Sequence, residues 1–348
     1  MQEPACGGAR SVYRLSDPVG PGGLMFYAIR HFTRYRYSRP VWQSVMQLRM
    51  QPRSEHTQRC FTFQLAISPQ VRLFSYQDHI GNVVHHFDVP GQHRQLTIIA
   101  DALVDVETPA PLPESLGPDA WGEIDALIER DDYWDMLLPS RYAHTSPELV
   151  ALAEELEVDR RDGRQPLELL TTLNRKLYHH FSYVKRSTEV DTAIEDAIRS
   201  RKGVCQDFAH IMISMVRNLR IPCRYVSGYL HRDPDHADRS DEGATHAWVE
   251  ALLPGIGWVG FDPTNNLIVG GRHIRTAIGR DYADVSPSVG TMKGSAETEL
   301  QVRVRVIPSD AVLPPDKEFA ADEEWSRFLQ SDLQAEKLHA QQQQQQQQ

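Results

Sequence analysis

Short segments in which hydrophobic and polar residues alternate follow one another from residue 25 to residue 107, as β-strands do. Turn-forming pairs such as Gln51-Pro52 and Pro90-Gly91 separate them. The expected strands are 26–37, 42–49, 61–67, 71–76, 83–89 and 96–106. Several short strands at near-regular spacing favour an antiparallel sandwich or barrel. Residues 25–107 are therefore predicted to form a β-rich, sandwich-like domain.

The hydrophobic pattern changes after a proline-rich stretch, which predicts a linker over residues 108–145. Ser146-Pro147 predicts the start of a helix, because Ser caps helices and Pro suits their first turn. Leucines at helical spacing predict a second helix over 166–181. Further strands are expected at 223–230, 246–252, 258–262 and 299–307. Residues 146–308 are thus predicted to form an α+β core that closes with a C-terminal strand.

Both ends of the chain have compositions that do not favour a packed core. Residues 1–24 are rich in glycine, proline and polar residues, which is typical of an unstructured extension. Beyond residue 308 we expect an exposed helix over 319–340 and then a homopolymeric glutamine tail over 341–348.

Composition narrows the classes of function. The net charge is -10, from 37 basic and 47 acidic side chains, which argues against a general nucleic-acid binder. No apolar run approaches the ~18 residues of a membrane helix, and the first 24 residues lack the apolar segment of a signal peptide. We therefore expect a cytoplasmic protein with no membrane partner.

The cysteines form no CxxC pair, so neither a disulfide framework nor a structural zinc site is predicted, and no cofactor is implied. They are Cys6, Cys60, Cys205 and Cys223.

Cys205 begins a segment with apolar residues at helical spacing, so it falls in the first turn of a helix. Unsatisfied N–H groups and the positive end of the helix dipole stabilise a thiolate there, and can also stabilise an oxyanion. Gly203 would let a substrate approach closely, and Asp207 should point away from the sulfur and anchor a neighbouring loop. A small core residue is the competing interpretation of Cys205, and this segment alone leaves both open.

His246 and Asp262 strengthen the catalytic interpretation. Their segments alternate on either side of the turn Pro254-Gly255, so a β-hairpin is predicted. We expect a register in which Leu252 lies opposite Ile256, Trp248 opposite Gly260 and His246 opposite Asp262. A shift by two residues would keep His246 and Asp262 on one face. An Asp beside an imidazole orients it and stabilises imidazolium, which allows the other nitrogen to deprotonate a thiol.

Several motifs together resemble the bacterial transglutaminase-like family. They are GVCQDFAH at 203–210, IPCRYVSGYL at 221–230, THAWVEALLPGIGW at 245–258 and GFDPTNN at 260–266. Residues 27–37, YAIRHFTRYRY, are similar to the start of the β-rich region that precedes the core in this family. The resemblance implies a papain-like fold and a Cys-His-Asp triad formed by Cys205, His246 and Asp262. The calcium-binding apparatus of animal transglutaminases has no recognisable counterpart here.

The resemblance implies acyl transfer through a thioester on Cys205, acting on a protein, peptide or amide substrate. Three alternatives stay open: an amidase or peptidase, a protein-glutamine γ-glutamyltransferase with an amine acceptor, and a non-catalytic interaction module. The charged loop 231–243 should admit water, so hydrolysis is favoured. Besides Gly203, the candidates for the substrate cleft are Gln206, Tyr183 and Trp248. The substrate, the acceptor and the oligomeric state are not indicated by the sequence.

Overall fold

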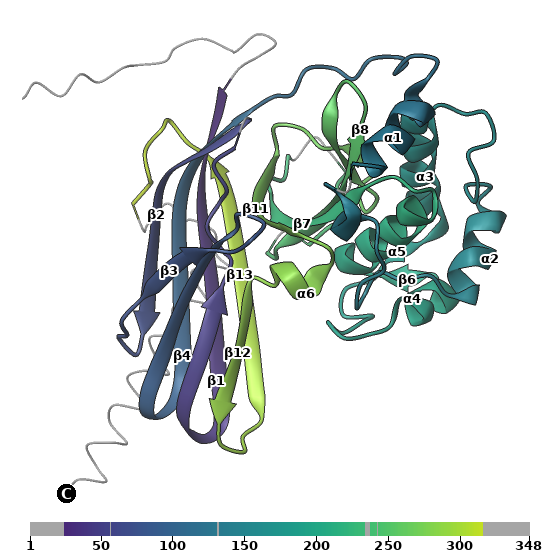
Figure 1. Ribbon diagram of the computed structural model, residues 1–348. Helices are drawn as coiled ribbons and strands as arrows, with labels where there is room; N and C mark the ends of the chain where they lie inside the picture. Colours follow the sequence, from purple (N-terminus) through teal and green to yellow (C-terminus); the bar gives the residue numbers. More distant parts are fainter. Residues whose placement is uncertain (1–23, 56, 131, 234–236, 242, 316–348) are drawn as a thin grey trace, which may run out of the picture.

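The computed structural model describes residues 24–55, 57–130, 132–233, 237–241 and 243–315. The predicted N-terminal extension, apart from residue 24, the predicted helix at 319–340 and the glutamine tail lie outside these residues. The described chain forms two lobes, one built from long strands and one built from helices around a smaller sheet (Figure 1). The predicted α+β class is confirmed.

The first lobe is one antiparallel sheet of six strands. The expected strands 26–37 and 42–49 are joined in a single strand, and so are 83–89 and 96–106. The strands are β1 (Leu24–Leu48), β2 (Gln58–Ser68), β3 (Phe74–Gln77), β4 (Val83–Glu107), β12 (Ser288–Lys293) and β13 (Thr298–Pro308).

The long strands β1 and β4 fold back, so that the two halves of the sheet face each other. Their pairing is irregular between Arg36 and Gln43. Tyr35 Oη lies 2.7 Å from Ser288 Oγ, although Ser288 pairs with the far end of β1 at Leu48. Apolar residues from both halves form one buried cluster, which includes Met46, Leu48, Phe87, Leu96 and Ile98. The sandwich-like arrangement is therefore produced by one folded sheet.

The C-terminal strand belongs to this first lobe, which corrects its predicted place in the core. β13 pairs with β1 from Tyr27↔Pro308 to Tyr37↔Thr298. Val304 packs with Tyr27 and Ile29 in a cluster between the lobes. Alternation predicts a strand but not its partner, which tertiary packing decides.

The second lobe contains a five-stranded antiparallel sheet in the order β10-β9-β8-β7-β11. Ala247, Val249 and Ala251 of β8 pack in the same cluster as the helices, whereas Trp248 belongs to a separate cluster. The strands are β7 (Cys223–Leu230), β8 (His246–Leu253), β9 (Gly257–Asp262), β10 (Leu267–Ile268) and β11 (His273–Gly279), with a small pair formed by β5 (Ser182–Tyr183) and β6 (Lys202–Gly203).

Helices cover this sheet on one side (Figure 1). Ser146 caps the predicted first helix, since its Oγ accepts a hydrogen bond from Leu149 N at 3.2 Å. No helix among the described residues is long and apolar enough to span a membrane. The helices are α1 (Ala120–Ile128), η1 (Trp134–Met136), α2 (Pro147–Glu155), α3 (Pro166–His180), α4 (Ile194–Ser200), α5 (Cys205–Asn218) and α6 (Tyr282–Val285).

Residues 108–145 are more than the predicted linker, because they contain α1 and η1 and contribute to the core. Ile124 and Ala143 are fully buried in the main apolar cluster. Asp125 binds Arg161 at 2.8 Å. The prolines mark the start of this segment correctly, but proline content does not reveal the buried residues beyond it.

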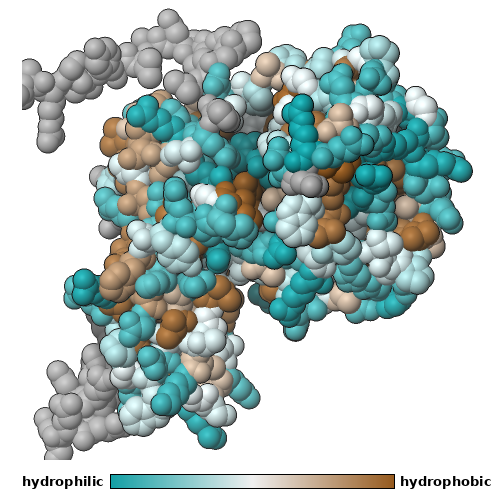
Figure 2. Space-filling model, viewed as in Figure 1, coloured by the Kyte–Doolittle hydropathy of each residue, from teal (hydrophilic) through white to brown (hydrophobic). Residues whose placement is uncertain are grey.

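The two lobes are in contact over part of their height (Figure 2). At this contact, side-chain amides from the first lobe form hydrogen bonds with the outer edge of β11. Asn82 accepts a hydrogen bond from Ile278 N at 2.9 Å and donates one to Ile278 O at 2.8 Å. Gln58 makes the equivalent pair with Arg275 N and O. An edge strand whose backbone groups are paired in this way is protected from other chains and held in place.

We expect Asn82→Ala to lower the free energy of unfolding by about 2 kcal/mol or more, because it leaves both buried backbone groups of Ile278 without partners. Asn218→Ala, at an exposed helix end, is the matched control and should change it by less than about 0.5 kcal/mol. Denaturant unfolding measures both. Equal effects of the two substitutions would contradict this role of Asn82.

Candidate functional site

Cys205 is the first residue of α5, where the sequence places it. Asp207 caps the start of this helix: its Oδ2 accepts hydrogen bonds from Val204 N at 2.7 Å and from Thr188 Oγ1 at 2.6 Å. Burial raises the pKa of Asp207. The expected anchoring of a neighbouring loop by Asp207 is confirmed.

Gly203 and Gln206, two of the predicted cleft residues, have structural roles at the start of α5. A Cβ on Gly203 would lie 2.8 Å from the Cβ of Asp207, so the glycine makes room for this capping side chain. Gln206 Nε2 donates a hydrogen bond to Val190 O at 2.9 Å, in the loop that Asp207 also anchors. Neither residue lines the cavity described below.

His246 and Asp262 meet across β8 and β9, with His246 Nε2 2.8 Å from Asp262 Oδ2. The predicted register is wrong by two residues, because Leu252 pairs with Trp258 and Val249 with Phe261. The two strands continue closer to the turn than expected, with Leu253 opposite Gly257. Because side chains alternate with period two, the shift leaves His246 and Asp262 on the same face.

The Asp262 carboxylate is fully buried and accepts five hydrogen bonds. Oδ1 accepts from Thr264 N at 3.0 Å and Asn265 N at 3.1 Å, both in the turn that follows β9. Burial alone would raise the pKa of Asp262, but His246 and His273 outweigh it and hold the pKa well below its usual range. Asp262 is therefore ionised in the folded protein.

Burial would lower the pKa of His246, but Asp262 and then Cys205 outweigh it and raise the pKa to about 10. Nε2 is committed to Asp262, whereas the buried Nδ1 makes no hydrogen bond. Cys205 is among the groups that raise this pKa, although no hydrogen bond joins its sulfur to Nδ1. Such loose contacts are common in sites without substrate.

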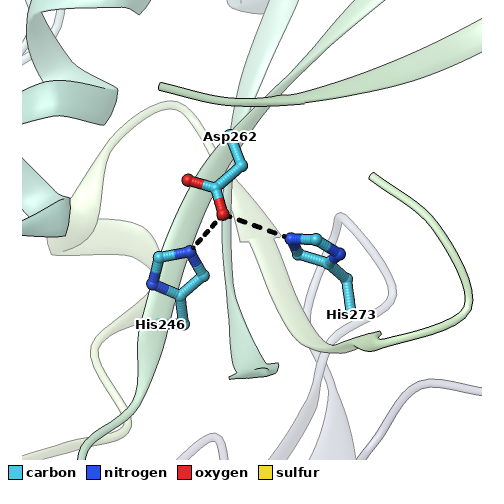
Figure 3. Close-up of side chains that lie close together, drawn as sticks. All are labelled: His246, Asp262 and His273. Atoms are coloured by element: carbon cyan, nitrogen blue, oxygen red, sulfur yellow. Dashed lines mark hydrogen bonds and ion pairs between the residues drawn. The ribbon is translucent and has the colours of Figure 1, made fainter. Parts of the chain in front are cut away.

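His273, on β11, is a site residue that is not among the predicted ones. Both imidazole rings point toward Asp262 (Figure 3), and His273 Nε2 lies 3.3 Å from Asp262 Oδ2. Gly270 N donates to His273 Nδ1 at 3.4 Å, which places the ring proton on Nε2, where it faces the carboxylate. The pairing of β11 with β7 is irregular between Arg275 and Ala277, so the regular alternation that predicts a strand is interrupted in this segment.

Asn265 also has a role that the sequence does not indicate. Its Nδ2 donates to Asp262 Oδ2 at 2.8 Å, and its Oδ1 accepts from Arg239 N at 2.7 Å. The side chain thereby ties the loop before β8 to the buried carboxylate. The motif GFDPTNN could have indicated this role, since Asp, Pro and Asn together are typical of a turn after a strand, and Asn side chains in turns form hydrogen bonds with backbone groups.

Trp248 does not line the substrate cleft, which corrects its predicted role. The side chain is fully buried, and its ring lies 5.2 Å from that of His273 in an edge-on arrangement. The small residue beside it is Gly228, where a Cβ would lie 2.6 Å from the indole, and not the predicted Gly260. Trp248 therefore supports the histidines from inside the lobe.

A cavity of about 870 Å³ opens in front of Cys205. Tyr183 lines it, as predicted for the cleft, and its Oη accepts a hydrogen bond from Asp241 N at 3.3 Å. Burial and the nearby Cys205 raise the pKa of Tyr183. The lining residues come from both lobes: Tyr183, Lys185, Arg186, Val204, Cys205, Leu230, Arg232, Asp241, Gly243, Ala244, Thr245, Arg303, Val304, Arg305, Val306 and Ile307.

Among the described residues, His246, Asp262 and His273 are the combination whose ligand atoms could hold a metal ion, since these atoms lie within 4.8 Å of one another. Two histidines and a carboxylate are a common ligand set for zinc. Here the same atoms already form hydrogen bonds with each other. A metal ion would displace the ring protons and break the contact that orients His246.

The other described cysteines are free thiols in environments that disfavour a thiolate. Cys223 is fully buried, and burial raises its pKa to about 11. Burial likewise raises the pKa of Cys60 to about 11. Of these three, Cys205 alone lines the cavity.

Two parts of the chain match described protein families. Residues 27–105 match the bacterial transglutaminase-like N-terminal region, and residues 151–263 match the transglutaminase-like superfamily. An uncharacterised protein of Mycobacterium tuberculosis is 34% identical over 309 residues, which is 84% of this chain and 96% of that protein. One of Mycobacterium leprae is 31% identical over 277 residues, 79% of this chain and 96% of that protein.

A protein-glutamine γ-glutamyltransferase of Pseudomonas aeruginosa is 32% identical over 127 residues, 35% of this chain and 19% of that protein. Among solved structures, a candidate cysteine protease from Cytophaga hutchinsonii superposes with a TM-score of 0.62 at 21% identity. The likeness covers 84% of this chain and 93% of that one. It confirms the predicted fold, a transglutaminase-like core preceded by a β-rich region.

Replacing His273 tests the hydrogen-bond network around Asp262. The depressed pKa of Asp262 stabilises the fold above the unfolded pKa of about 4, and this contribution is lost as the pH falls through the folded value. We expect His273→Leu, which lacks a donor, to be less stable than His273→Gln by about 1.5 kcal/mol or more at neutral pH.

Because the pKa of Asp262 is held well below its usual range, Asp262 stays ionised in the folded state of both variants, and the difference between them should persist from about pH 7 to about pH 4. Denaturant unfolding over this range measures it. Equal stability of the two variants would show that His273 acts through packing alone.

Proposed function

The chain belongs to the transglutaminase-like superfamily, and we propose that it is a cysteine enzyme that cleaves carboxamide or peptide bonds through a thioester on Cys205. One observation carries the proposal. A buried His246–Asp262 pair leaves Nδ1 of the imidazole without a hydrogen bond, and Cys205, which lines a large cavity, is among the groups that raise the pKa of this imidazole. These features support Cys205 as the nucleophile, His246 as its base and Asp262 as the acid that orients the base, which is the arrangement of activated cysteines.

In the proposed reaction, Nδ1 of His246 takes the proton of the Cys205 thiol, and Asp262 stabilises the resulting imidazolium. The sulfur attacks the carbonyl carbon, and backbone N–H groups at the start of α5, such as that of Cys205, stabilise the oxyanion. Collapse breaks the C–N bond, and the leaving amine takes the proton from His246. Water, deprotonated by His246, then cleaves the thioester and releases the acid.

Water is the favoured acceptor because the cavity has little to exclude it. Tyr183 is the aromatic residue in the described lining, and about half of the other lining residues are polar or charged. Tyr225 and Tyr229, the aromatic residues of β7, are fully buried and lie outside this lining. A screened tunnel that protects a thioester from water for a bound amine is therefore not supported.

Transfer to an amine is the second candidate, and the partial match to a protein-glutamine γ-glutamyltransferase favours it. A third candidate is an interaction module without turnover. The presence of Cys205, His246 and Asp262 together speaks against this one, since a module without turnover does not need a nucleophile, a base and an orienting acid.

We expect iodoacetamide at neutral pH to alkylate Cys205 at least about tenfold faster than Cys223. Cys205 lines the cavity, whereas burial excludes reagent from Cys223 and raises its pKa to about 11. Peptide mapping after limited alkylation follows each cysteine separately. His246→Ala should slow the labelling of Cys205 and leave that of Cys223 unchanged. Preferential labelling of Cys223 would remove the basis for the proposed nucleophile.

The fate of the acyl group is tested with glutamine-containing peptides and peptide amides, offered with and without a fluorescent primary amine. We expect release of ammonia or peptide without incorporation of the amine. Cys205→Ala should abolish the release, and Cys60→Ala is the matched control. Dominant incorporation of the amine, lost in Cys205→Ala, would show that the acceptor is an amine.

A further inference from the structure

One face of β1 is buried although it points away from the second lobe. Tyr27 and Ile29 pack with residues of the second lobe, and His31 Nδ1 lies 3.0 Å from Tyr229 Oη. Side chains alternate along a strand, so the even-numbered residues from 28 to 34 lie on the opposite side. We call this side the outer face; its residues on β1 are Ala28, Arg30, Phe32 and Arg34.

The folded half of the first sheet does not cover the outer face either. Leu96 and Ile98 of β4 pack with Met46, which belongs to that half. Their pairing partners on β1 are Tyr35 and Thr33, which are odd-numbered. Directly paired residues point to the same side of a sheet, so the folded half lies on the same side as the second lobe.

The outer face is nevertheless covered. Phe32 and Arg34 are only 1% exposed, and Ala28 is fully buried. A face of an antiparallel sheet is open to solvent unless another element packs on it. Long side chains that stand on such a face, a phenyl ring and a guanidinium among them, become fully buried only under such an element.

The buried strip is about as wide as one helix. On β13, which lies beside β1, the outer-face residues Arg303 and Arg305 are half-buried. On β2, which lies beyond β4, Gln64 and Ala66 of the same face are exposed. Strands lie about 4.8 Å apart, and a helix with its side chains is about 10 Å across. A single helix that lies along β1 produces this decrease in burial.

The chain beyond β13 has the position and the length to supply that helix. β13 ends beside β1, where Ser309 N donates a hydrogen bond to Phe26 O at 2.9 Å. Residues 309–318 join this end to the helix predicted over 319–340, and a reversal of direction needs fewer residues than that. Such a helix would be about 33 Å long, whereas residues 28–34 of β1 span about 20 Å.

The sequence of the predicted helix also suits this face. Trp325, Phe328 and Leu329 follow one another at spacings of three and one, so they share one side of the helix. A buried guanidinium needs acceptors around it, and carboxylates are the strongest of these. Gln301 supplies one acceptor to Arg34. The acids of the predicted helix are Asp322, Glu323, Glu324, Asp332 and Glu336.

We propose that residues 319–340 pack as an amphipathic helix along the outer face of β1, with Trp325 and Phe328 against Phe32. The sheet of the first lobe is then a layer between this helix and the second lobe. The helix is not exposed on all sides, as the sequence alone predicts. This proposal is independent of the proposed function.

Introduced thiols report in the full-length chain whether the outer face is covered. Ala28→Cys places a thiol on β1, and Gln64→Cys places one on the exposed part of the same face. We expect iodoacetamide to label the first at least about a hundredfold more slowly than the second. Peptide mapping distinguishes both from the native cysteines, and Thr97→Cys serves if Ala28→Cys does not fold.

Trp325→Asp/Phe328→Asp should remove the cover and raise the labelling rate at Ala28→Cys at least about tenfold. Gln330→Asp/Gln334→Asp, which adds the same charge to the other side of the predicted helix, should leave this rate unchanged. The labelling of buried Cys223 monitors unfolding of the whole protein. If it rises, Trp325→Ala and Leu329→Ala replace the double variant.

A second copy of the chain is the competing occupant of the outer face. Protection by a second copy would increase with protein concentration between about 1 µM and about 100 µM and would survive Trp325→Asp/Phe328→Asp. Protection by residues 319–340 should be independent of concentration and lost in this variant. Rapid labelling of Ala28→Cys in the otherwise unchanged chain would overturn the proposal, and so would equal effects of the two double variants.

Discussion

The ionised carboxylate of Asp262, buried without access to water, is the constraint on which the site depends. Burying an isolated charge costs far more than a fold of this size can tolerate, so every lone pair needs a donor. The donors come from three places in the chain: His246 on β8, His273 on β11 and the turn at residues 264–265. Correct register in three strands is therefore a condition for the charge to be stable, and the proposed chemistry needs that same charge.

The first lobe contributes to this condition because it secures β11. That strand is the edge of its sheet, and Gln58 and Asn82 satisfy its outward backbone groups. Its first residue, His273, then donates to Asp262. On the other side of the site, β13 of the same lobe forms a wall of the cavity. The two lobes thus act as one unit around Cys205, which explains why the N-terminal region and the core occur in one chain.

Local patterns predict most of the elements and the three central residues, because strand alternation, helix capping and turn residues depend on near neighbours. What they cannot supply is the partner of each strand. The alternation of residues 299–307 predicts a strand equally well in either lobe, and β13 joins the first one. The hairpin of β8 and β9 is predicted two residues out of register, yet the pair His246–Asp262 survives because sheet faces alternate. Trp248 and Gly203 are assigned to the cleft only because burial cannot be judged from their sequence positions; the fold gives both of them internal neighbours.

Two imidazoles share one carboxylate, and their surroundings decide which of them can act as a base. His273 accepts a hydrogen bond at Nδ1 from Gly270, packs against Trp248, and has its pKa lowered by burial. It can donate to Asp262 but has no nitrogen left to receive a proton. Nδ1 of His246 makes no hydrogen bond, and Asp262 and then Cys205 raise the pKa of this imidazole to about 10. A proton that leaves the thiol therefore has one destination. The difference arises from a single backbone N–H and from the position of each ring relative to the cavity, which is how environment assigns distinct roles to chemically equal groups.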